Sequence, residues 1–352
     1  MSTLQIAPSH ARNQSMECFK IIAAILVVFM HVPFPGKMQG YLIAFANFAV
    51  PLFFAISGYF NYGADSKTIA RRLKHLLRLY LVVIVTSVLV GVFMTEVTGG
   101  STVVFLKRFI PDGREIMHWL VYQNDPRNGQ LWYLTSACLC YVILWVYVRY
   151  FGEDTVNYRA LYFAAFSLFG VYYALGCLSS PEGLDIPYVI CRNGFYCGFP
   201  MFALGIFLRE HQERIINNYE LTNRRLLLLI FAGGAFTLLQ YHFLGMGLMT
   251  LGTVLEVTAL LLLLAGHPVV TKRSGFLCAC VARFGAWSTY IYILHELVLQ
   301  IYDGIFQKTV ATASSEQLEA WLRPFLVAAL SLAAAVLFEL GERLIRRLRR
   351  HS

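Results

Sequence analysis

The sequence contains little charge for its length. Only 14% of its 352 residues are Asp, Glu, Lys or Arg, whereas 58% are hydrophobic. Soluble domains carry about 25% charged residues, so this composition excludes an ordinary soluble protein. A membrane-spanning helix needs about 20 predominantly apolar residues, and the chain offers many such stretches. We therefore expect an all-α, polytopic membrane helix bundle.

The sequence also lacks a paired cysteine motif. None of its eight cysteines forms a C-x-x-C, and the C-x-C of Cys278 and Cys280 has no histidine nearby, so we expect no metal. Cys177 and Cys191 flank a segment expected outside the membrane, where disulfides persist. A bridge between them and two free thiols are both open alternatives. Residues 1–15 lack the apolar core and cleavage site of a signal peptide and are expected to form a cytosolic tail.

About ten apolar stretches are expected to cross the membrane, within a single domain covering residues 1–352. Most of the 29 lysines and arginines fall in alternate connections, which places both termini in the cytoplasm, with a second, basic tail at 344–352. The net charge of +9 then reflects topology and not nucleic-acid binding. The loop 99–130 is external, and its short apolar stretch 116–123 is expected to be interfacial or re-entrant. The expected spans are 17–36, 41–62, 76–98, 131–150, 159–178, 188–208, 224–241, 247–265, 286–303 and 321–343.

The first apolar stretch carries two ionisable residues, Lys20 and His31. In a helix they would share one face, about 16 Å apart along the axis. Lys20 would lie at the cytosolic boundary, where a snorkelling anchor is one interpretation. His31 would lie beyond the middle of the bilayer, where an ionisable group is costly and indicates a functional site. Imidazole is also the side chain that best exchanges a proton near neutral pH.

Lys20-x10-His31 resembles the R/K-x10-H motif of the acyltransferase-3 family of membrane proteins. Further similarities to the motifs of that family follow in the same order between residues 16 and 300. They are VPLFFAISGYF (50–60), RRLKHLLRLY (71–80), LWYL (131–134), RNGFYCGFPMFALG (192–205) and STYIYILH (288–295).

The resemblance implies transfer of an acyl group, usually acetyl, from cytosolic acyl-CoA to a hydroxyl of an envelope glycan or similar acceptor. His31 would act as general base or acyl relay, and Lys20 would orient or sense the donor. The expected location is a bacterial-type cytoplasmic membrane, with the lipid bilayer, acyl-CoA and the acceptor as partners, and no metal.

A basic stretch on the cytosolic side fits the phosphates of CoA, which Arg and Lys bind through charge-assisted hydrogen bonds. It contains Arg71, Arg72, Lys74 and Arg78. Their spacing covers more than one helix face, so not all of them can contact one ligand. We favour Arg78, with Arg71 or Lys74 second. Ordinary topology anchoring is the alternative interpretation of the whole cluster.

Five further polar residues are candidates for the acceptor site. Gln130 precedes the LWYL motif, where the family often has histidine, and Trp132 lies within it. Arg192 begins the sixth span at its external end, and Glu256 lies in the middle of the eighth. His295, followed by Glu296, could join a polar cavity with His31. Hydrogen bonding between helices is the alternative for His295, and external anchoring for Arg192.

Two other functions are compatible with the residues alone. A proton-coupled carrier or exporter could use His31 as a relay, but it would not need the basic cytosolic stretch for CoA. A structural, partner-binding membrane subunit would leave the position of His31 unexplained.

Overall fold

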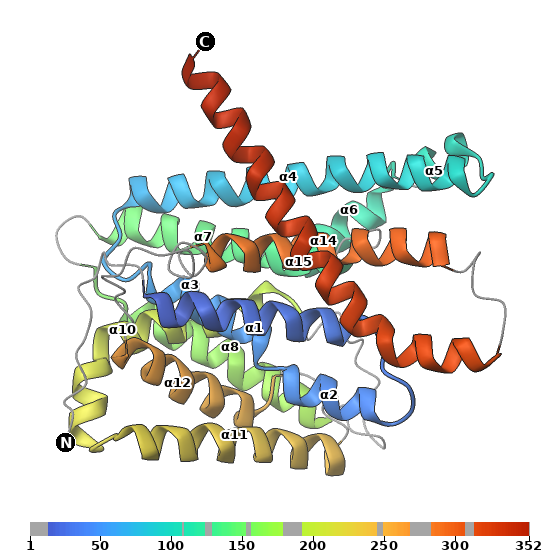
Figure 1. Ribbon diagram of the computed structural model, residues 1–352. Coiled ribbons are helices and arrows are strands. Elements are labelled where there is room, and N and C mark those ends of the chain that lie inside the picture. Colours follow the sequence, from blue (N-terminus) through green and yellow to red (C-terminus); the bar gives the residue numbers. More distant parts are fainter. Residues whose placement is uncertain are drawn as a thin grey trace. The chain divides into compact units, whose positions relative to one another are not determined.

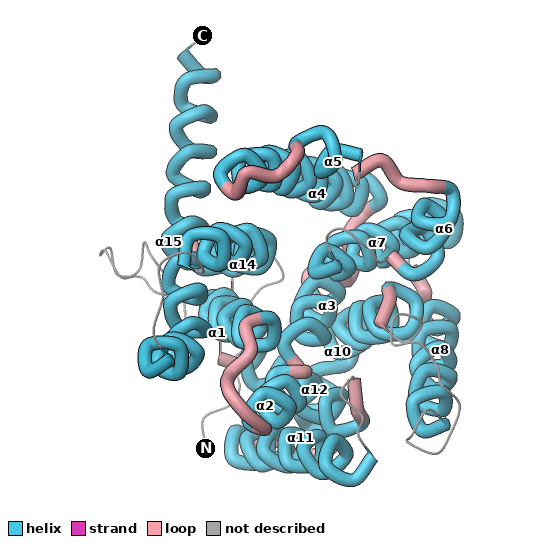
Figure 2. Tube along the Cα trace, turned by 90° about the vertical axis from the view of Figure 1, so that its right-hand side faces the viewer, coloured by secondary structure: helices cyan, strands magenta, loops and turns pink. Residues whose placement is uncertain are grey.

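The computed structural model describes residues 13–107, 109–123, 129–152, 156–178, 192–244, 249–267, 283–306 and 313–351. These residues form helices and contain no strand (Figure 2). The all-α prediction is therefore confirmed. Contacts divide the chain into two compact units, and a long helix, α4 (Ser66–Val97), contributes to both.

The first unit comprises the described residues within 50–82 and 111–268. In addition to the start of α4, its helices are α3 (Ala49–Tyr59), α6 (Gly113–Tyr122), α7 (Trp132–Phe151), α8 (Arg159–Leu178), α10 (Phe199–Asn218), α11 (Asn223–Leu244) and α12 (Leu251–Gly266). Two short elements, the 3₁₀ turn η1 (Gly129–Leu131) and the π-helical turn η2 (Gly194–Gly198), precede α7 and α10.

The second unit comprises residues 12–49, 83–110 and 269–352. Its helices are α1 (Gln14–His31), α2 (Met38–Ala46), the rest of α4, α5 (Thr102–Lys107), α14 (Phe284–Phe306) and α15 (Ala313–His351) (Figure 1). Within this unit α1 packs against α2, α14 and α15, and α14 packs against α15. The first helix is therefore the centre of the unit.

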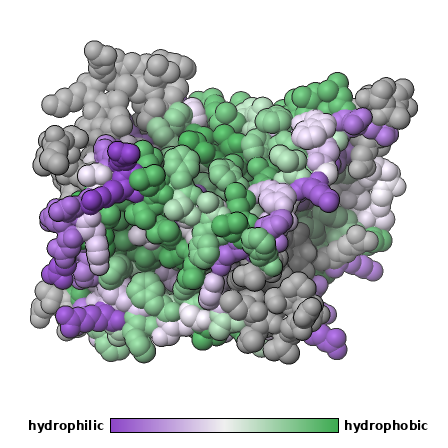
Figure 3. Space-filling model, turned by 90° about the horizontal axis from the view of Figure 1, so that it is seen from below, coloured by the Kyte–Doolittle hydropathy of each residue, from purple (hydrophilic) through white to green (hydrophobic). Residues whose placement is uncertain are grey.

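Six segments of the described chain are long and apolar enough to cross a membrane. The helices α8 and α12 contain shorter apolar segments. On the face shown in Figure 3, apolar side chains form a broad area and hydrophilic ones gather toward its margins. Ten crossings and cytoplasmic termini stay predictions. The six segments are Gln14–His31, Met38–Tyr59, Ser66–Val97, Trp132–Phe151, Asn223–Phe243 and Glu316–Leu348.

The second expected span, 41–62, overlaps the candidate membrane segment Met38–Tyr59, but the structure interrupts this segment between α2 and α3. Asn47 ends α2, and Pro51 lies four residues later in α3. A proline has no N–H for the carbonyl four residues before it, and its ring clashes with that carbonyl. The break at Asn47 is thus a backbone effect that hydrophobicity does not register.

The third expected span, 76–98, begins too late, since α4 starts at Ser66. Asp65 caps this start, because its side chain accepts a hydrogen bond of 3.0 Å from the N–H of Thr68. The first turns of α4 are helical but charged, so an apolar criterion misses them. At about 1.5 Å per residue the 32 residues of α4 extend for about 48 Å.

The short apolar stretch 116–123 falls mainly in α6, which is too short to span a membrane. Asp112 and Glu115 close its first turn reciprocally, and Met117 and Leu120 are exposed on its surface. Its interfacial location stays a prediction. The proposed bridge of Cys177 and Cys191 and nearly all of the tail 1–15 lie outside the residues whose contacts are described.

Two motif glycines bring α3 and α10 together in the first unit. A Cβ on Gly58 would overlap the carbonyl of Phe202, and one on Gly205 would overlap the carbonyl of Ala55. Each glycine therefore lies against the backbone of the partner helix. Small residues allow this close approach in membrane helix pairs. The glycines of the SGY and ALG motifs are thus explained by packing.

We predict that Gly205→Ala destabilises the protein by about 1–3 kcal/mol, because a methyl group there must displace backbone. The matched control is Gly170→Ala on α8, where a Cβ meets nothing within 4 Å. This control should be neutral or slightly stabilising, since alanine favours helix. Thermal unfolding of both variants in detergent checks the prediction, and equal midpoints would contradict it.

Candidate functional site

The last residue of α1 is His31, and its position depends on how that helix ends. Pro33 has no N–H, so the carbonyl of Phe29 loses its usual helical donor. The Nε2 of Gln39, on α2, donates instead to the carbonyl of Phe29 and to that of the next residue, both at 3.2 Å. Its Oε1 accepts the N–H of Phe34 at 2.9 Å. Gln39 therefore fixes the turn that carries His31.

His295 lies on α14 and is fully buried. Its Nδ1 is 2.6 Å from the carbonyl of Tyr292, and since a carbonyl only accepts, Nδ1 must carry the proton. The other ring nitrogen, Nε2, then presents a lone pair. This atom is buried and has no hydrogen-bond partner among the described residues. His295 is thus a proton acceptor whose orientation is fixed by the backbone.

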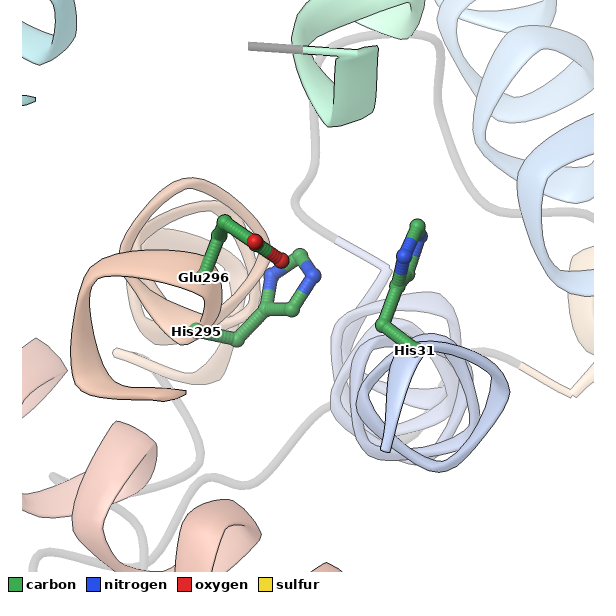
Figure 4. Close-up of side chains that lie close together, drawn as sticks. All are labelled: His31, His295 and Glu296. Atoms are coloured by element: carbon green, nitrogen blue, oxygen red, sulfur yellow. The ribbon is translucent and has the colours of Figure 1, made fainter. Parts of the chain in front are cut away.

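His31 and His295 face each other from α1 and α14 (Figure 4). Their ring centroids are 5.0 Å apart, with the planes tilted by 46°. Glu296 lies beside them, and the ligand atoms of the three side chains are all within 4.8 Å of one another. His31 and Glu296 are half-buried. We call the rings of His31 and His295 the imidazole pair. A pair of this kind can accept, share and return a proton.

Lys20 lies on the same continuous helix as His31, as the spacing predicted. Its ammonium forms an ion pair of 2.8 Å with Glu17, and only 18% and 14% of the two side chains are exposed. Both groups lie against Gly285 at the start of α14, where a Cβ would be 3.0 Å from the Lys20 nitrogen. α1 and α14 therefore run parallel, with the ion pair at one end of their contact and the imidazole pair at the other.

Three of the four basic residues expected to bind CoA share one face of α4. Arg71, Lys74 and Arg78 are at positions i, i+3 and i+7, which a helix places within about 60° of one another. All three are exposed and make no hydrogen bond or ion pair with the described residues. We call them the basic stripe. Their side chains are available to an anionic ligand.

Arg72 points elsewhere and has a structural partner. Its guanidinium donates to the carbonyl of Phe60 at 2.8 Å and to the side chain of Asn61 at 2.7 Å. Asn61 is buried and in turn donates to Tyr141 at 3.0 Å. Arg72 therefore holds the end of α3, and the structure separates it from the basic stripe.

Two of the acceptor-site candidates lie together in the first unit. The guanidinium of Arg192 is 4.8 Å from the ring centre of Trp132, a cation–π contact at the start of α7. The indole Nε1 of Trp132 is buried without a hydrogen-bond partner among the described residues. Gln130 lies in η1, and its side chain is outside the description.

Glu256 is a buried carboxyl on α12, with 5% of its surface exposed. A Cβ on Gly234 of α11 would lie 3.9 Å from both carboxyl oxygens, so the acid packs over a glycine. Glu256 makes no hydrogen bond or ion pair with the described part of the chain. Glu256 belongs to the first unit and His295 to the second.

Sequence reasoning missed Gln39 and Glu17. Gln39 had a weak signal, because a proline after a helix leaves carbonyls that need a polar partner. Glu17 is three residues before Lys20, a spacing at which helical side chains meet. Neither residue belongs to the motifs that first drew attention to this segment.

Comparison with known proteins adds one finding. The acyltransferase-3 family model, described as an acyltransferase domain, matches residues 13–340, nearly the whole chain. The search of curated proteins gave no match. The search of solved structures gave none either.

We predict that Gln39→Leu destabilises the end of α1 by about 1–3 kcal/mol, because it leaves partly buried carbonyls without a donor. The neighbouring Met38→Leu is the control, since Met38 is 61% exposed. Hydrogen exchange of residues 29–34 and thermal unfolding would both register the loss. Wild-type protection in Gln39→Leu would show that the turn does not depend on this side chain.

Proposed function

Because the chain belongs to the acyltransferase-3 family, we propose that it transfers an acyl group from cytosolic acyl-CoA to a hydroxyl. Acetyl is the proposed group, and an envelope glycan or similar molecule the proposed acceptor. The family supports membrane acyl transfer itself. The donor, the acceptor and a bacterial-type cytoplasmic membrane are our further proposals. The observation that carries them is the imidazole pair inside a largely apolar helix packing.

His31 is the proposed general base. It takes the proton of the acceptor hydroxyl while the hydroxyl oxygen attacks the thioester carbon of acyl-CoA. The carbon–sulfur bond then breaks, and the CoA sulfur leaves with the proton that the imidazolium returns. An imidazole suits both steps because its ordinary pKa lies close to neutrality. No second proton carrier is required for the reaction to balance.

His295 is the proposed positioning partner of His31. Its Nδ1–H is held by the carbonyl of Tyr292, and its ring is turned toward His31 (Figure 4). The lone pair of its Nε2 can accept a hydrogen bond from the His31 ring or from the incoming hydroxyl. Such a hydrogen bond would favour one orientation of the group that donates it. Correct orientation of reacting groups contributes much of the rate of enzymatic reactions.

The basic stripe of Arg71, Lys74 and Arg78 is the proposed phosphate site for CoA. These side chains carry positive charge without the local partners that hold Arg72. Lys20 is proposed to orient the donor, with Glu17 limiting the freedom of its ammonium group. Trp132 and Arg192 are proposed to contact the acceptor, since indole and guanidinium groups both donate hydrogen bonds to sugar oxygens. Gln130 and Glu256 are kept as further candidates.

We predict that His31→Ala abolishes acyl transfer while leaving folded protein. Acid–base catalysis contributes about 10²–10⁴-fold, so the residual rate should fall below detection. The measurement is incorporation of label from acetyl-CoA into the glycan fraction of membrane vesicles. His118→Ala on α6 is the control, and it should retain wild-type transfer. Full activity in His31→Ala would remove the proposed mechanism.

We predict that Arg78→Ala weakens binding of labelled acetyl-CoA to the purified protein roughly tenfold to hundredfold. A hydrogen bond to a charged group contributes about 1.5–3 kcal/mol, and 1.4 kcal/mol is a tenfold change in affinity. Arg214→Ala, an exposed arginine at the far end of α10, is the charge-matched control.

Arg72→Ala serves to distinguish an effect on folding from an effect on acetyl-CoA binding. It should lower the thermal midpoint, because it removes the donor at the end of α3. Arg78→Ala should keep the wild-type midpoint. If acetyl-CoA and longer acyl-CoAs all fail to bind the folded wild type, the proposed donor is wrong.

A further inference from the structure

We infer that His31, His295 and Glu296 also form a binding site for a divalent transition-metal ion of the zinc class, and that a bound ion inhibits transfer. Ion binding is a property of the three side chains alone. Only the inhibition rests on the proposed function. The ion is not a cofactor, so this inference is compatible with an enzyme that needs no metal.

The donor set is two imidazoles and one carboxylate, which suits zinc, cobalt or nickel better than magnesium or calcium. Two ligands bound to one ion at about 2.1 Å can be no more than about 4.2 Å apart. The three ligand atoms are now within 4.8 Å of one another. A modest rotation of side chains therefore closes the site, and Glu296 has three rotatable bonds with which to do so.

His295 already has the arrangement of a metal-binding histidine. Such residues usually donate their second ring N–H to a carbonyl or carboxylate, which fixes the ring and makes the ligand nitrogen more basic. The carbonyl of Tyr292 serves His295 in this way at 2.6 Å. The free Nε2 is buried and has no described hydrogen-bond partner, and Figure 4 shows the His295 ring turned toward His31 with the Glu296 carboxylate beside it. A cation would supply the partner that this nitrogen lacks.

The charges near the site favour a cation. Glu296 contributes a half-buried carboxyl to the site, and Asp303 follows it two helical turns later on α14. Arg323 is bound to Asp303 at 2.5 Å, and Lys20 is bound to Glu17 at the other end of the α1–α14 contact. Both of these cations are therefore already paired with carboxylates. A divalent ion would meet one carboxylate and two imidazole rings.

Inhibition follows from the same lone pairs. A ring nitrogen that binds the ion cannot accept the proton of a hydroxyl. Zinc would therefore compete with proton transfer at His31 and would hold His295 away from its positioning role. Removal of the ion by a chelator should restore the reaction, since no covalent bond has changed.

The test uses the full-length protein, purified in detergent and freed of metal by a chelator. Zinc binding is measured by equilibrium dialysis, and cobalt binding by its absorption spectrum. We expect one ion per chain, with affinity at least about tenfold weaker in Glu296→Gln and in His295→Gln. His211→Gln is the matched control, because His211 also lies beside a glutamate. Its Nδ1 is 3.6 Å from the Oε2 of Glu210. This variant should bind the ion like wild type.

The possible results test the ion site, the proposed function and the inhibition separately. Absence of a bound ion, or equal affinity in wild type and Glu296→Gln, would overturn the inferred site. Since Glu296→Gln preserves shape, a monodisperse variant excludes unfolding as the cause of lost binding. Zinc binding in a protein that shows no acyl transfer would count against the proposed function alone. Transfer that persists with the site filled would overturn inhibition.

Discussion

The carbonyl groups at the end of α1 are the constraint on which the candidate site depends. Inside a membrane, a backbone carbonyl without a donor costs several kcal/mol, and Pro33 removes the donor that a continuing helix would supply. The side-chain amide of Gln39 supplies a donor in its place, and its oxygen accepts a hydrogen bond from the N–H of Phe34. The chain can therefore stop its first helix at His31 without leaving its backbone unsatisfied.

The second half of the imidazole pair depends on how α14 is held against its neighbours. Because α1 and α14 run parallel, one ion pair and one imidazole pair mark the two ends of a single helix contact. α14 is held in turn by α15, where Trp287 donates to Glu339 and Tyr290 to Glu342, both at 2.9 Å. These bonds keep α14 from rotating about its axis. A rotation of α14 would turn His295 away from His31.

Much of this arrangement could be predicted from residues alone. Apolar stretches locate the helices, and an ionisable residue at depth identifies His31 and His295 as special. The break at Asn47 and the early start of α4 at Ser66 were missed because they depend on hydrogen bonds of the backbone, which hydrophobicity does not measure. The role of Arg72 could not be predicted, because its partners Phe60 and Asn61 lie at the end of another helix. The spacing of the basic residues along α4 shows which of them share a helix face. It does not show which other helix each face contacts.

The length of α4 has a consequence for the setting in which the protein acts. Its roughly 48 Å exceed the hydrocarbon thickness of about 30 Å, and the basic stripe is confined to its first turns. If α4 crosses the bilayer as its apolar part indicates, those charges lie among lipid headgroups and the adjoining water. Anionic lipids attract lysine and arginine there by about 1 kcal/mol per residue, an attraction that salt screens. The headgroups would then compete with any phosphate-bearing ligand, so lipid composition and ionic strength would set its apparent affinity together.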